Sequence, residues 1–505
     1  MMRRPKISRP LVTGGLIIFS AALAWGQGLQ NSGLQYLQTI GIPGWRATGS
    51  AGNANVDLMG YNPVTRMMYL ADRTNNGIDV IDTHTNVVVG LIKMPPTSVQ
   101  TVPATGPNGV WVAVNLQQLV VTDGLQSVYV WDLRAPQAQP DIYTFPTSMG
   151  TDTDGIAYDP INQTVYIVTD NPPEYLIGIN LEYKRVVNQT PLPASADLIQ
   201  FNPVDGKIYI AAEDAENTPA NAAAGVYAYD PNTGNPGTVT LVTKVGPPCP
   251  GHGIDIDPVS NIAVVGCFLG AGDKGDIAVN LNTGALITTF TDVGGADAVV
   301  FNPNNRRFYI AATFTAAATS GCPKGTGTSY PLLGVIDENG GNPVAHVACT
   351  GGGHIVGVDP LTNFVYVPVS QYPADPTSTS TGVNGVAVFR DTTPPAQAPV
   401  TQAQATLTAV AGSGVAAAGT VQFSVVGRRM HLTATASGLP TSGQAAWLTV
   451  PTTITNEWLA CAVNPSNNTA GCSEDLLGDP LIGAVATLSV DSGSGGVAVA
   501  RGTIH

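Results

Sequence analysis

The stretch VDLMGYNPVTRMMYLADRTNNGIDVID, residues 56–82, decides the fold of this chain. Apolar and polar residues alternate up to an Asn-Pro pair at residues 62–63, a second apolar segment follows around Tyr69, and a third ends at Asp82. An Asn or Asp side chain before proline bonds the backbone of a tight turn while the proline fixes φ. The stretch therefore predicts three consecutive antiparallel strands joined by short turns.

The same unit recurs along most of the chain. Its turn proline follows an Asn or Asp in six copies, at Pro63, Pro160, Pro203, Pro258, Pro303 and Pro360. The interval between Pro63 and Pro160 is about twice as long as the others and holds a degenerate copy, without the proline, that starts at Asn108. Repeats of roughly 40 to 50 residues built from short strands are typical of β-propellers. We expect an all-β protein with a seven-bladed β-propeller at residues 37–391.

A fourth strand follows most units, as residues 86–92 follow the first. The last unit ends at Asp391 and runs directly into Pro394 and Pro395, so it has no fourth strand of its own. An extended segment at residues 37–43 precedes the first unit. We expect this segment to complete the seventh blade, which closes the ring and removes exposed strand edges.

The unit resembles the YVTN, or YncE-like, repeat family. The resemblance rests on the Asx-Pro turn, on second strands such as Ile208-Tyr209-Ile210, and on the third strand at residues 78–83, and it covers residues 37–391. It implies the propeller fold. The family spans surface-layer, binding and poorly characterised exported proteins, with relatives among lactonases and quinoprotein subunits, so the resemblance does not assign a function.

A second β-domain is expected after a proline-rich linker at residues 392–400. Residues 401–505 are rich in Ala, Gly, Thr and Val and alternate in polarity at 419–426 and 430–436. A separate β-module must pack two sheet faces together to bury its apolar side. We therefore predict a small β-sandwich-like domain, which resembles no family that we recognise.

The N-terminus is typical of an exported protein. Basic residues, an apolar stretch at 11–23 and a small-x-small site at 22–24 predict a signal peptide at residues 1–24. We expect a secreted, periplasmic or cell-surface protein with no membrane span after cleavage; an uncleaved anchor is the alternative. In an oxidising compartment six cysteines favour disulfides, although 15 pairings are open. Proximity in sequence pairs Cys249 with Cys267, Cys322 with Cys349, and Cys461 with Cys472.

Charge and motifs exclude several functions. A net charge of −14 and the lack of a basic run after the N-terminus argue against binding to nucleic acid. No nucleophile-elbow, zinc-protease, Walker or dinucleotide motif occurs in a strand-to-helix context. Whether the chain is an enzyme is therefore open, with a non-enzymatic role favoured.

One polar position recurs at the start of each unit, six residues before the proline. It is occupied by Asp57, Asn108, Asp154, Asp197, His252, Asp297 and His354. Because inner strands of a propeller begin at one channel mouth, these side chains are candidates for a ligand-binding ring. Oxygen and imidazole groups suit a divalent cation, with Asp197, His252, Asp297 and His354 as candidate ligands. Alternatively, the side chains point at the neighbouring blade and only satisfy backbone groups there.

Three functions fit these features. The first is a binding or interaction protein that holds a protein, small-molecule or carbohydrate ligand at the channel mouth and at inserted loops, residues 214–224 and 315–330. The second is a metal-assisted lyase or hydrolase, or a lactonase-like enzyme, that uses the His/Asp ring. The third is a structural protein of the cell surface.

Overall fold

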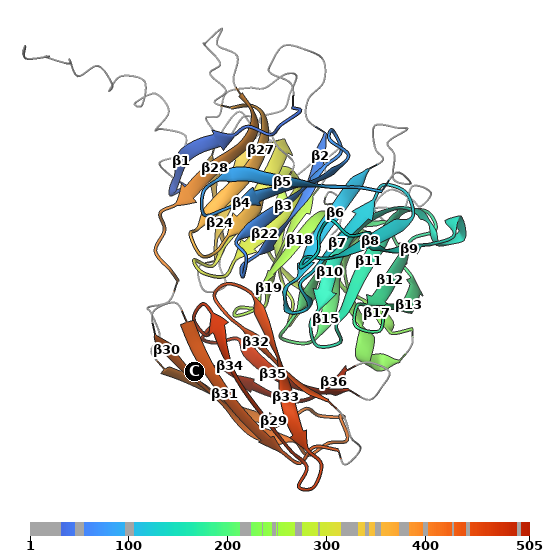
Figure 1. The fold of residues 1–505 in the computed structure, drawn as a ribbon, viewed down its shortest axis with the longest axis vertical. Helices are drawn as coiled ribbons and strands as arrows, with labels where there is room; N and C mark the ends of the chain where they lie inside the picture. Colours follow the sequence, from blue (N-terminus) through green and yellow to red (C-terminus); the bar gives the residue numbers. More distant parts are fainter. Residues whose placement is uncertain are drawn as a thin grey trace, which may run out of the picture.

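The structure is a computed structural model that describes residues 32–45, 55–95, 106–212, 224–234, 236–244, 249, 251–267, 275–290, 293–314, 332–338, 343–348, 355–372, 383–396, 402–426, 429–440, 445–491 and 496–505. Within these residues the chain forms seven four-stranded antiparallel sheets and one closed eight-stranded sheet. The seven sheets are the blades of a propeller, and the closed sheet forms a second body at one end of it (Figure 1). The predicted all-β, seven-bladed fold is confirmed.

Six blades are built from four consecutive strands, and we number them in chain order. The first three are β2 (Val56–Asn62), β3 (Met67–Asp72), β4 (Gly77–Asp82) and β5 (Val87–Lys93); β6 (Pro107–Ala113), β7 (Gln118–Asp123), β8 (Ser127–Asp132) and β9 (Asp141–Thr144); and β10 (Thr151–Asp159), β11 (Thr164–Asn171), β12 (Tyr175–Asn180) and β13 (Arg185–Pro191). The next three are β14 (Ala196–Asn202), β15 (Lys207–Ala212), β16 (Gly225–Asp230) and β17 (Thr238–Lys244); β18 (Gly251–Asp257), β19 (Ile262–Cys267), β20 (Asp276–Asn280) and β21 (Ala285–Phe290); and β22 (Gly294–Asn302), β23 (Arg307–Phe314), β24 (Leu332–Asp337) and β25 (Val344–Ala348). Short 3-10 turns lie at Val114–Leu116, Thr147–Met149 and Pro231–Thr233.

The seventh blade is closed by the N-terminal strand. Its strands are β26 (Gly357–Asp359), β27 (Phe364–Tyr372), β28 (Val383–Asp391) and β1 (Leu34–Ile40), in the order β1-β28-β27-β26. Strand β1 pairs antiparallel with β28, from Leu34 opposite Asp391 to Ile40 opposite Val386. A Cβ atom on Gly385 would lie 2.2 Å from the carbonyl oxygen of Ile40, so this close pairing requires glycine there.

A buried polar network fixes the closure. The Arg307 guanidinium in blade six donates to the carbonyl oxygen of Ser32 and to Asp391, each at 2.8 Å. The hydroxyl of Tyr309 also donates to Asp391, at 2.6 Å. Arg307, Tyr309 and Asp391 are all buried, so the bonds are charge-assisted and shielded from water. Blade six thereby holds both strands that meet in blade seven.

The Asx-Pro turns form as the sequence predicts. In each of the six turns the side chain before proline accepts a hydrogen bond from the backbone N–H two residues on, at 2.8–3.0 Å, and this holds for Asn62, Asp159, Asn202, Asp257, Asn302 and Asp359. All six side chains are buried. The turns lie at the same end of the propeller because each follows an inner strand.

The second body, which we call the barrel domain, is one sheet closed on itself. Its strands are β29 (Gln402–Ala409), β30 (Ala418–Val426), β31 (Arg429–Ser437), β32 (Ala446–Pro451), β33 (Asn456–Asn464), β34 (Thr469–Leu477), β35 (Val485–Asp491) and β36 (Gly496–Thr503). They close in the order β29-β30-β31-β34-β33-β32-β35-β36. Strands β29 and β33 pair on both of their sides, so two sheet faces are joined at both edges around one apolar core. This is consistent with the expected sandwich-like domain and leaves no open edge.

Two of the three expected disulfides are present. Cys249 is bonded to Cys267 in blade five, and Cys461 is bonded to Cys472 between β33 and β34. Cys322 and Cys349 lie outside the described residues, as do the expected signal peptide and nearly all of both inserted loops. Among the residues that the structure describes, no helix is long and apolar enough to cross a membrane.

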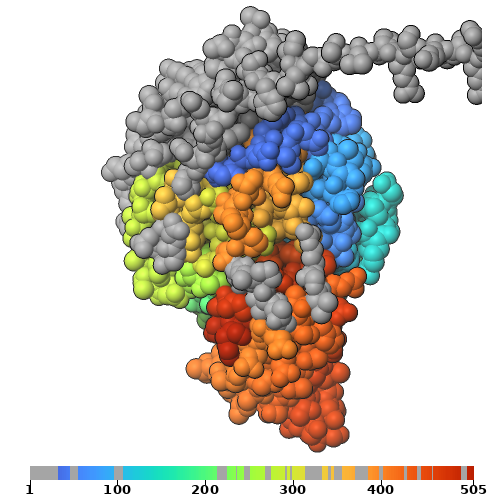
Figure 2. Space-filling view, turned by 90° about the vertical axis from the view of Figure 1, so that its left-hand side faces the viewer, coloured from blue at the N-terminus to red at the C-terminus, as the bar shows by residue number. Residues whose placement is uncertain are grey.

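The barrel domain lies against the end of the propeller that carries the Asx-Pro turns. Figure 2 shows it, in orange to red, projecting from that end. A Cβ atom on Gly483 would lie 3.0 Å from Val259 in the turn of blade five. Arg501 of β36 lies beside Gly206 in the turn of blade four and interacts electrostatically with Asp205. The linker also bonds the turn of blade six, where Ala396 N donates to the carbonyl of Asn304 at 2.9 Å.

Candidate functional site

The central channel has two chemically different ends because all inner strands run in the same direction. The strands begin at the end where the recurring polar position lies. They finish at the opposite end in the Asx-Pro turns, where the barrel domain is seated. We call these the polar end and the closed end.

At the polar end, the first two ring residues share a cation. Arg73, just after β3, forms an ion pair with Asp57, and its Nε lies 3.0 Å from the Oδ1 acceptor of Asn108. The amide of Asn108 in turn donates to Asp152 at 3.0 Å. Arg73 therefore joins blade one to blade two, and these polar groups are bonded across the boundary between blades. Sequence reasoning missed Arg73 because it lies outside the recurring position.

Blades four and five are linked in the same way. His252 Nδ1 lies 2.5 Å from Asp197 Oδ2, and both side chains are largely buried. Asp154 stands in the blade between these two pairs. Burial raises the pKa of Asp154 well above the usual range of an aspartate, and the nearby carboxylates of Asp57 and Asp197 raise it further. Asp154 therefore favours its protonated form more than an ordinary aspartate does.

Of the four predicted metal ligands, the structure places Asp197 and His252 in contact. The side chain of Asp297 and the whole of His354 lie outside the described residues, so the ring is described only at its five other positions. Within the described part of the chain, no group of three or more His, Cys, Asp or Glu side chains is arranged to hold a metal ion. A divalent cation at this end stays a prediction.

The channel holds a chamber toward the closed end. The chamber has a volume of about 290 Å³ and is lined by the inner strands of all seven blades. Its lining starts at Leu58 and Leu198, each one residue beyond a ring aspartate, and extends to the turn prolines. Most lining side chains are aliphatic or aromatic. The chamber and the polar ring therefore occupy successive levels of one channel.

The barrel domain forms the wall of the chamber at the closed end. The turn between β32 and β33 contributes Thr452, Ile454 and Thr455, and the next loop contributes Leu481. Thr452 stiffens this turn, because its hydroxyl accepts from the backbone N–H groups of Ile454 and Thr455 at 3.2 and 3.1 Å. The six turn prolines line the chamber around this turn: Pro63, Pro160, Pro203, Pro258, Pro303 and Pro360. The repeated turns thus form the seat of the second domain.

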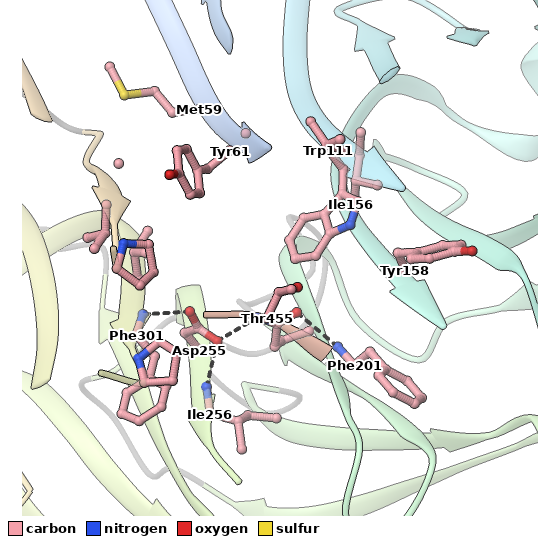
Figure 3. A pocket seen from close by; sticks show the side chains of 18 of the residues that line it. Met59, Tyr61, Trp111, Ile156, Tyr158, Phe201, Asp255, Ile256, Phe301 and Thr455 are labelled. Atoms are coloured by element: carbon pink, nitrogen blue, oxygen red, sulfur yellow. Dashed lines mark hydrogen bonds between the residues drawn. The ribbon is translucent and has the colours of Figure 1, made fainter. Parts of the chain in front are cut away.

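Among the described residues of the lining, one acid, Asp255, faces this chamber. Asp255, in the inner strand of blade five, accepts hydrogen bonds from Gln200 Nε2 at 2.5 Å, from Ile256 N at 2.7 Å and from Phe301 N at 2.6 Å (Figure 3). It therefore bridges blades four, five and six. Burial raises the pKa of Asp255 to about 6, although the three donors oppose the shift. At pH 7.5 its carboxyl group is mostly ionised.

Aromatic side chains line the same chamber, and Tyr61 and Trp111 lie across it from Asp255 (Figure 3). Tyr61 and Tyr158 are anchored by hydroxyl bonds to Asp359 at 2.7 Å and to Asn115 at 3.0 Å, so their rings are held in place. Trp111 and Tyr61 keep part of their surface open, whereas Tyr158 is buried. These rings form a preorganised apolar wall.

Sequence reasoning did not find the chamber. The sequence signal that marks it is the residue three positions before the turn proline. In four blades this residue is small or apolar: Gly60, Ala157, Val300 and Gly357. In blades four and five it is polar, as Gln200 and Asp255. Polar side chains at a position that is small or apolar in the other blades indicate a polar interaction specific to blades four and five. Without the neighbouring blades, however, their bonding partners are not visible.

Comparison with known proteins defines the fold and leaves the family open. No family model and no curated protein matches this chain. A chain of the Kuenenia stuttgartiensis hydrazine synthase aligns with a TM-score of 0.50 and 13% identity over 70% of this chain and 99% of that chain. A chain of the mitotic checkpoint complex aligns with a TM-score of 0.49 and 10% identity, over 77% of this chain and 96% of that chain. The WD40 domain of Neurospora crassa Pan2 aligns with a TM-score of 0.45 and 12% identity, over 67% of this chain and 90% of that chain. At these identities the likeness to hydrazine synthase shows a shared fold alone.

Proposed function

We propose that this chain is an exported binding protein that holds a small, largely apolar ligand in the chamber between the propeller and the barrel domain. The observation that carries the proposal is the chamber itself, about 290 Å³ in volume, apolar in most of its lining and supplied with one oriented carboxylate. Concave apolar cavities with a few fixed polar groups are the usual form of a small-molecule site.

The sequence supports the exported location. The predicted signal peptide at residues 1–24 and the resemblance of the repeats to the YVTN family both favour a protein outside the cytoplasm. The disulfides Cys249–Cys267 and Cys461–Cys472 are compatible with an oxidising compartment. Propellers present binding sites in many proteins because a rigid ring positions groups from several blades around one channel.

Filling the chamber tests the proposal. Val300 lines the chamber and is partly exposed, so Val300→Trp places an indole in the cavity. Val89 is 53% exposed on the outer strand of blade one, and Val89→Trp is the matched control. The probe is 1-naphthalenemethanol, with 1-naphthalenemethylamine as a second probe, and binding is followed by naphthalene fluorescence and calorimetry.

We expect saturable binding of one probe molecule per chain to the wild type and to Val89→Trp. Val300→Trp should lose this binding while its melting temperature stays close to that of the wild type. If both probes fail to bind the wild type, or bind Val300→Trp equally well, the chamber is not the ligand site.

A further inference from the structure

We infer that the chamber selects a cationic ligand: a small organic ammonium compound whose apolar body fills the chamber and whose nitrogen bonds the carboxylate of Asp255. The inference rests on the proposed function, since it names the chemical class of ligand for the same site. It uses four independent features of the channel, which are the charge of the lining, the bonding of Asp255, the aromatic walls and the acidic residues at the polar end.

The first feature is an uncompensated charge. Among the described residues that line the chamber, Asp255 alone carries a formal charge, and its hydrogen-bond donors are a side-chain amide and two backbone N–H groups. A carboxylate surrounded by apolar surface has lost much of its hydration, and neutral donors replace that hydration only in part. A ligand that brings a positive charge into the chamber supplies the missing partner. A neutral or anionic ligand does not.

The second feature is the remaining bonding capacity of Asp255. Among the described residues, Oδ1 accepts from Gln200 and from Ile256 N, whereas Oδ2 accepts from Phe301 N alone. A carboxylate oxygen takes two donors, so Oδ2 can accept one more hydrogen bond. Asp255 is only partly covered, and it belongs to the chamber lining. The three existing bonds hold the carboxylate in one orientation, so an incoming N–H group meets a preorganised acceptor.

The third feature is the aromatic wall. Tyr61 and Trp111, from blades one and two, line the chamber and remain partly exposed to it. Blades one and two lie across the channel from blade five, so these rings face the apolar body of a ligand whose nitrogen bonds Asp255. A chamber with an aromatic wall on one side and a carboxylate on the other therefore suits an amine that carries an apolar body.

The fourth feature is the field at the polar end. Asp57 and Asp197, two aspartates of the ring, each stand one residue before a residue that lines the chamber. Asp152 accepts a hydrogen bond from the ring residue Asn108. At the same level, Arg73 pairs with Asp57 and the ring residue His252 pairs with Asp197. Three carboxyl groups at this level, Asp57, Asp152 and Asp197, outnumber these two bases. A channel mouth with an excess of carboxylates concentrates cations and repels anions before they reach the chamber.

A matched pair of probes tests the inference. 1-Naphthalenemethylamine and 1-naphthalenemethanol have the same ring system and differ in charge at pH 7.5. We expect the wild type to bind the amine at least about tenfold more tightly than the alcohol. Asp255→Asn should bind the two probes with similar affinity. Asp141→Asn, which changes an exposed carboxylate on the outer strand of blade two, should keep the wild-type preference.

A second variant guards against a folding defect in Asp255→Asn. Gln200→Met removes one donor from Asp255 and retains the carboxylate, so the preference for the amine should persist or increase. Equal binding of the two probes by the wild type, or an unchanged preference in Asp255→Asn, overturns the inference while the chamber remains a binding site. Failure of both probes, in contrast, counts against the proposed function itself.

Discussion

The carboxylate of Asp255 in blade five accepts a hydrogen bond from the backbone nitrogen of Phe301 in blade six, at 2.6 Å. Inner strands are sheet edges, so their outward N–H groups lack a partner within their own blade. Asp255 satisfies one of these groups and is itself held toward the channel. The same contact therefore stabilises the ring of blades and orients the one charged group among the described residues of the chamber lining. Its two roles explain why a carboxylate is tolerated among apolar residues.

The closure of the ring should depend on Arg307. Replacing it in Arg307→Met leaves Asp391 and the carbonyl of Ser32 buried without their charged donor. Breaking such a buried pair costs about 3–5 kcal/mol. We expect a lower free energy of unfolding in urea. Arg134→Met, which removes an exposed pair with Asp132, is the control and should leave the unfolding curve unchanged. Similar curves for the two variants would show that the network does not hold blade seven closed.

The buried pair Asp72 and Asp79 should make stability depend on pH. Burial and the neighbouring Asp72 raise the pKa of Asp79 from the usual value to about 8. An unfolded aspartate releases its proton near pH 4. Between about pH 4 and pH 8 the folded chain therefore binds more protons than the unfolded chain, and the free energy of unfolding falls as the pH rises.

Asp79→Asn should remove the part of this dependence that comes from Asp79, because asparagine is a neutral isostere of the protonated acid. Thermal melts at pH 5 and pH 9 check the expectation. The variant should melt near the wild type at pH 5 and several degrees higher at pH 9, whereas Asp141→Asn should follow the wild type at both values. A parallel decline of Asp79→Asn and the wild type would contradict the assignment.

The Asx-Pro turns should contribute to stability in proportion to their burial. Asn302 is buried, accepts from Asn304 N at 3.0 Å and donates to Asn363 at 3.0 Å. Asn302→Ala removes both bonds, leaves Asn304 N without its side-chain acceptor and should cost about 1–3 kcal/mol, while Asn363 keeps its bond from Asn304 Nδ2. Asn280 makes the same turn bond to Asn282 N in an exposed position. Asn280→Ala should therefore change the urea midpoint much less, and an equal change in both variants would show that burial is not the cause.

The seat of the barrel domain should depend on two apolar side chains. Ile454 and Leu481 are 7% and 2% exposed and line the chamber at its closed end. Truncating both to alanine removes packing worth about 2–5 kcal/mol at each site. We expect faster proteolysis of the linker near residues 392–401, followed by mass spectrometry of the fragments. Leu125→Ala, at a 38% exposed site on blade two, is the control. Unchanged linker cleavage in the double variant would mean that these residues do not seat the domain.

Much of the fold could be read from local patterns. The Asx-Pro turns, the alternation of apolar residues and the tyrosine of the second strand recur within short windows, and each acts through nearest neighbours. The seven blades follow from counting these units. Close spacing in sequence likewise predicts two disulfides, Cys249–Cys267 and Cys461–Cys472.

The candidate site could be predicted only in part. Parity along an inner strand places the recurring polar residues at one level, but it does not say what each one bonds. Arg73 pairs with Asp57 from the loop after a different strand, and His252 meets Asp197 across the boundary between two blades. Such contacts depend on the distance between blades, which no short-range pattern encodes.

The sequence by itself determined the repeat, its number of copies and the level at which its polar residues stand, because these properties follow from bonding between neighbours in the chain. The tertiary structure alone decided that the turn prolines seat a second domain, that Ile454 and Leu481 close the channel, and that Asp255 faces the resulting chamber. The physical reason is that the barrel domain shares no period with the propeller. Its contact with the turns is set by shape and burial of apolar surface once both bodies have folded.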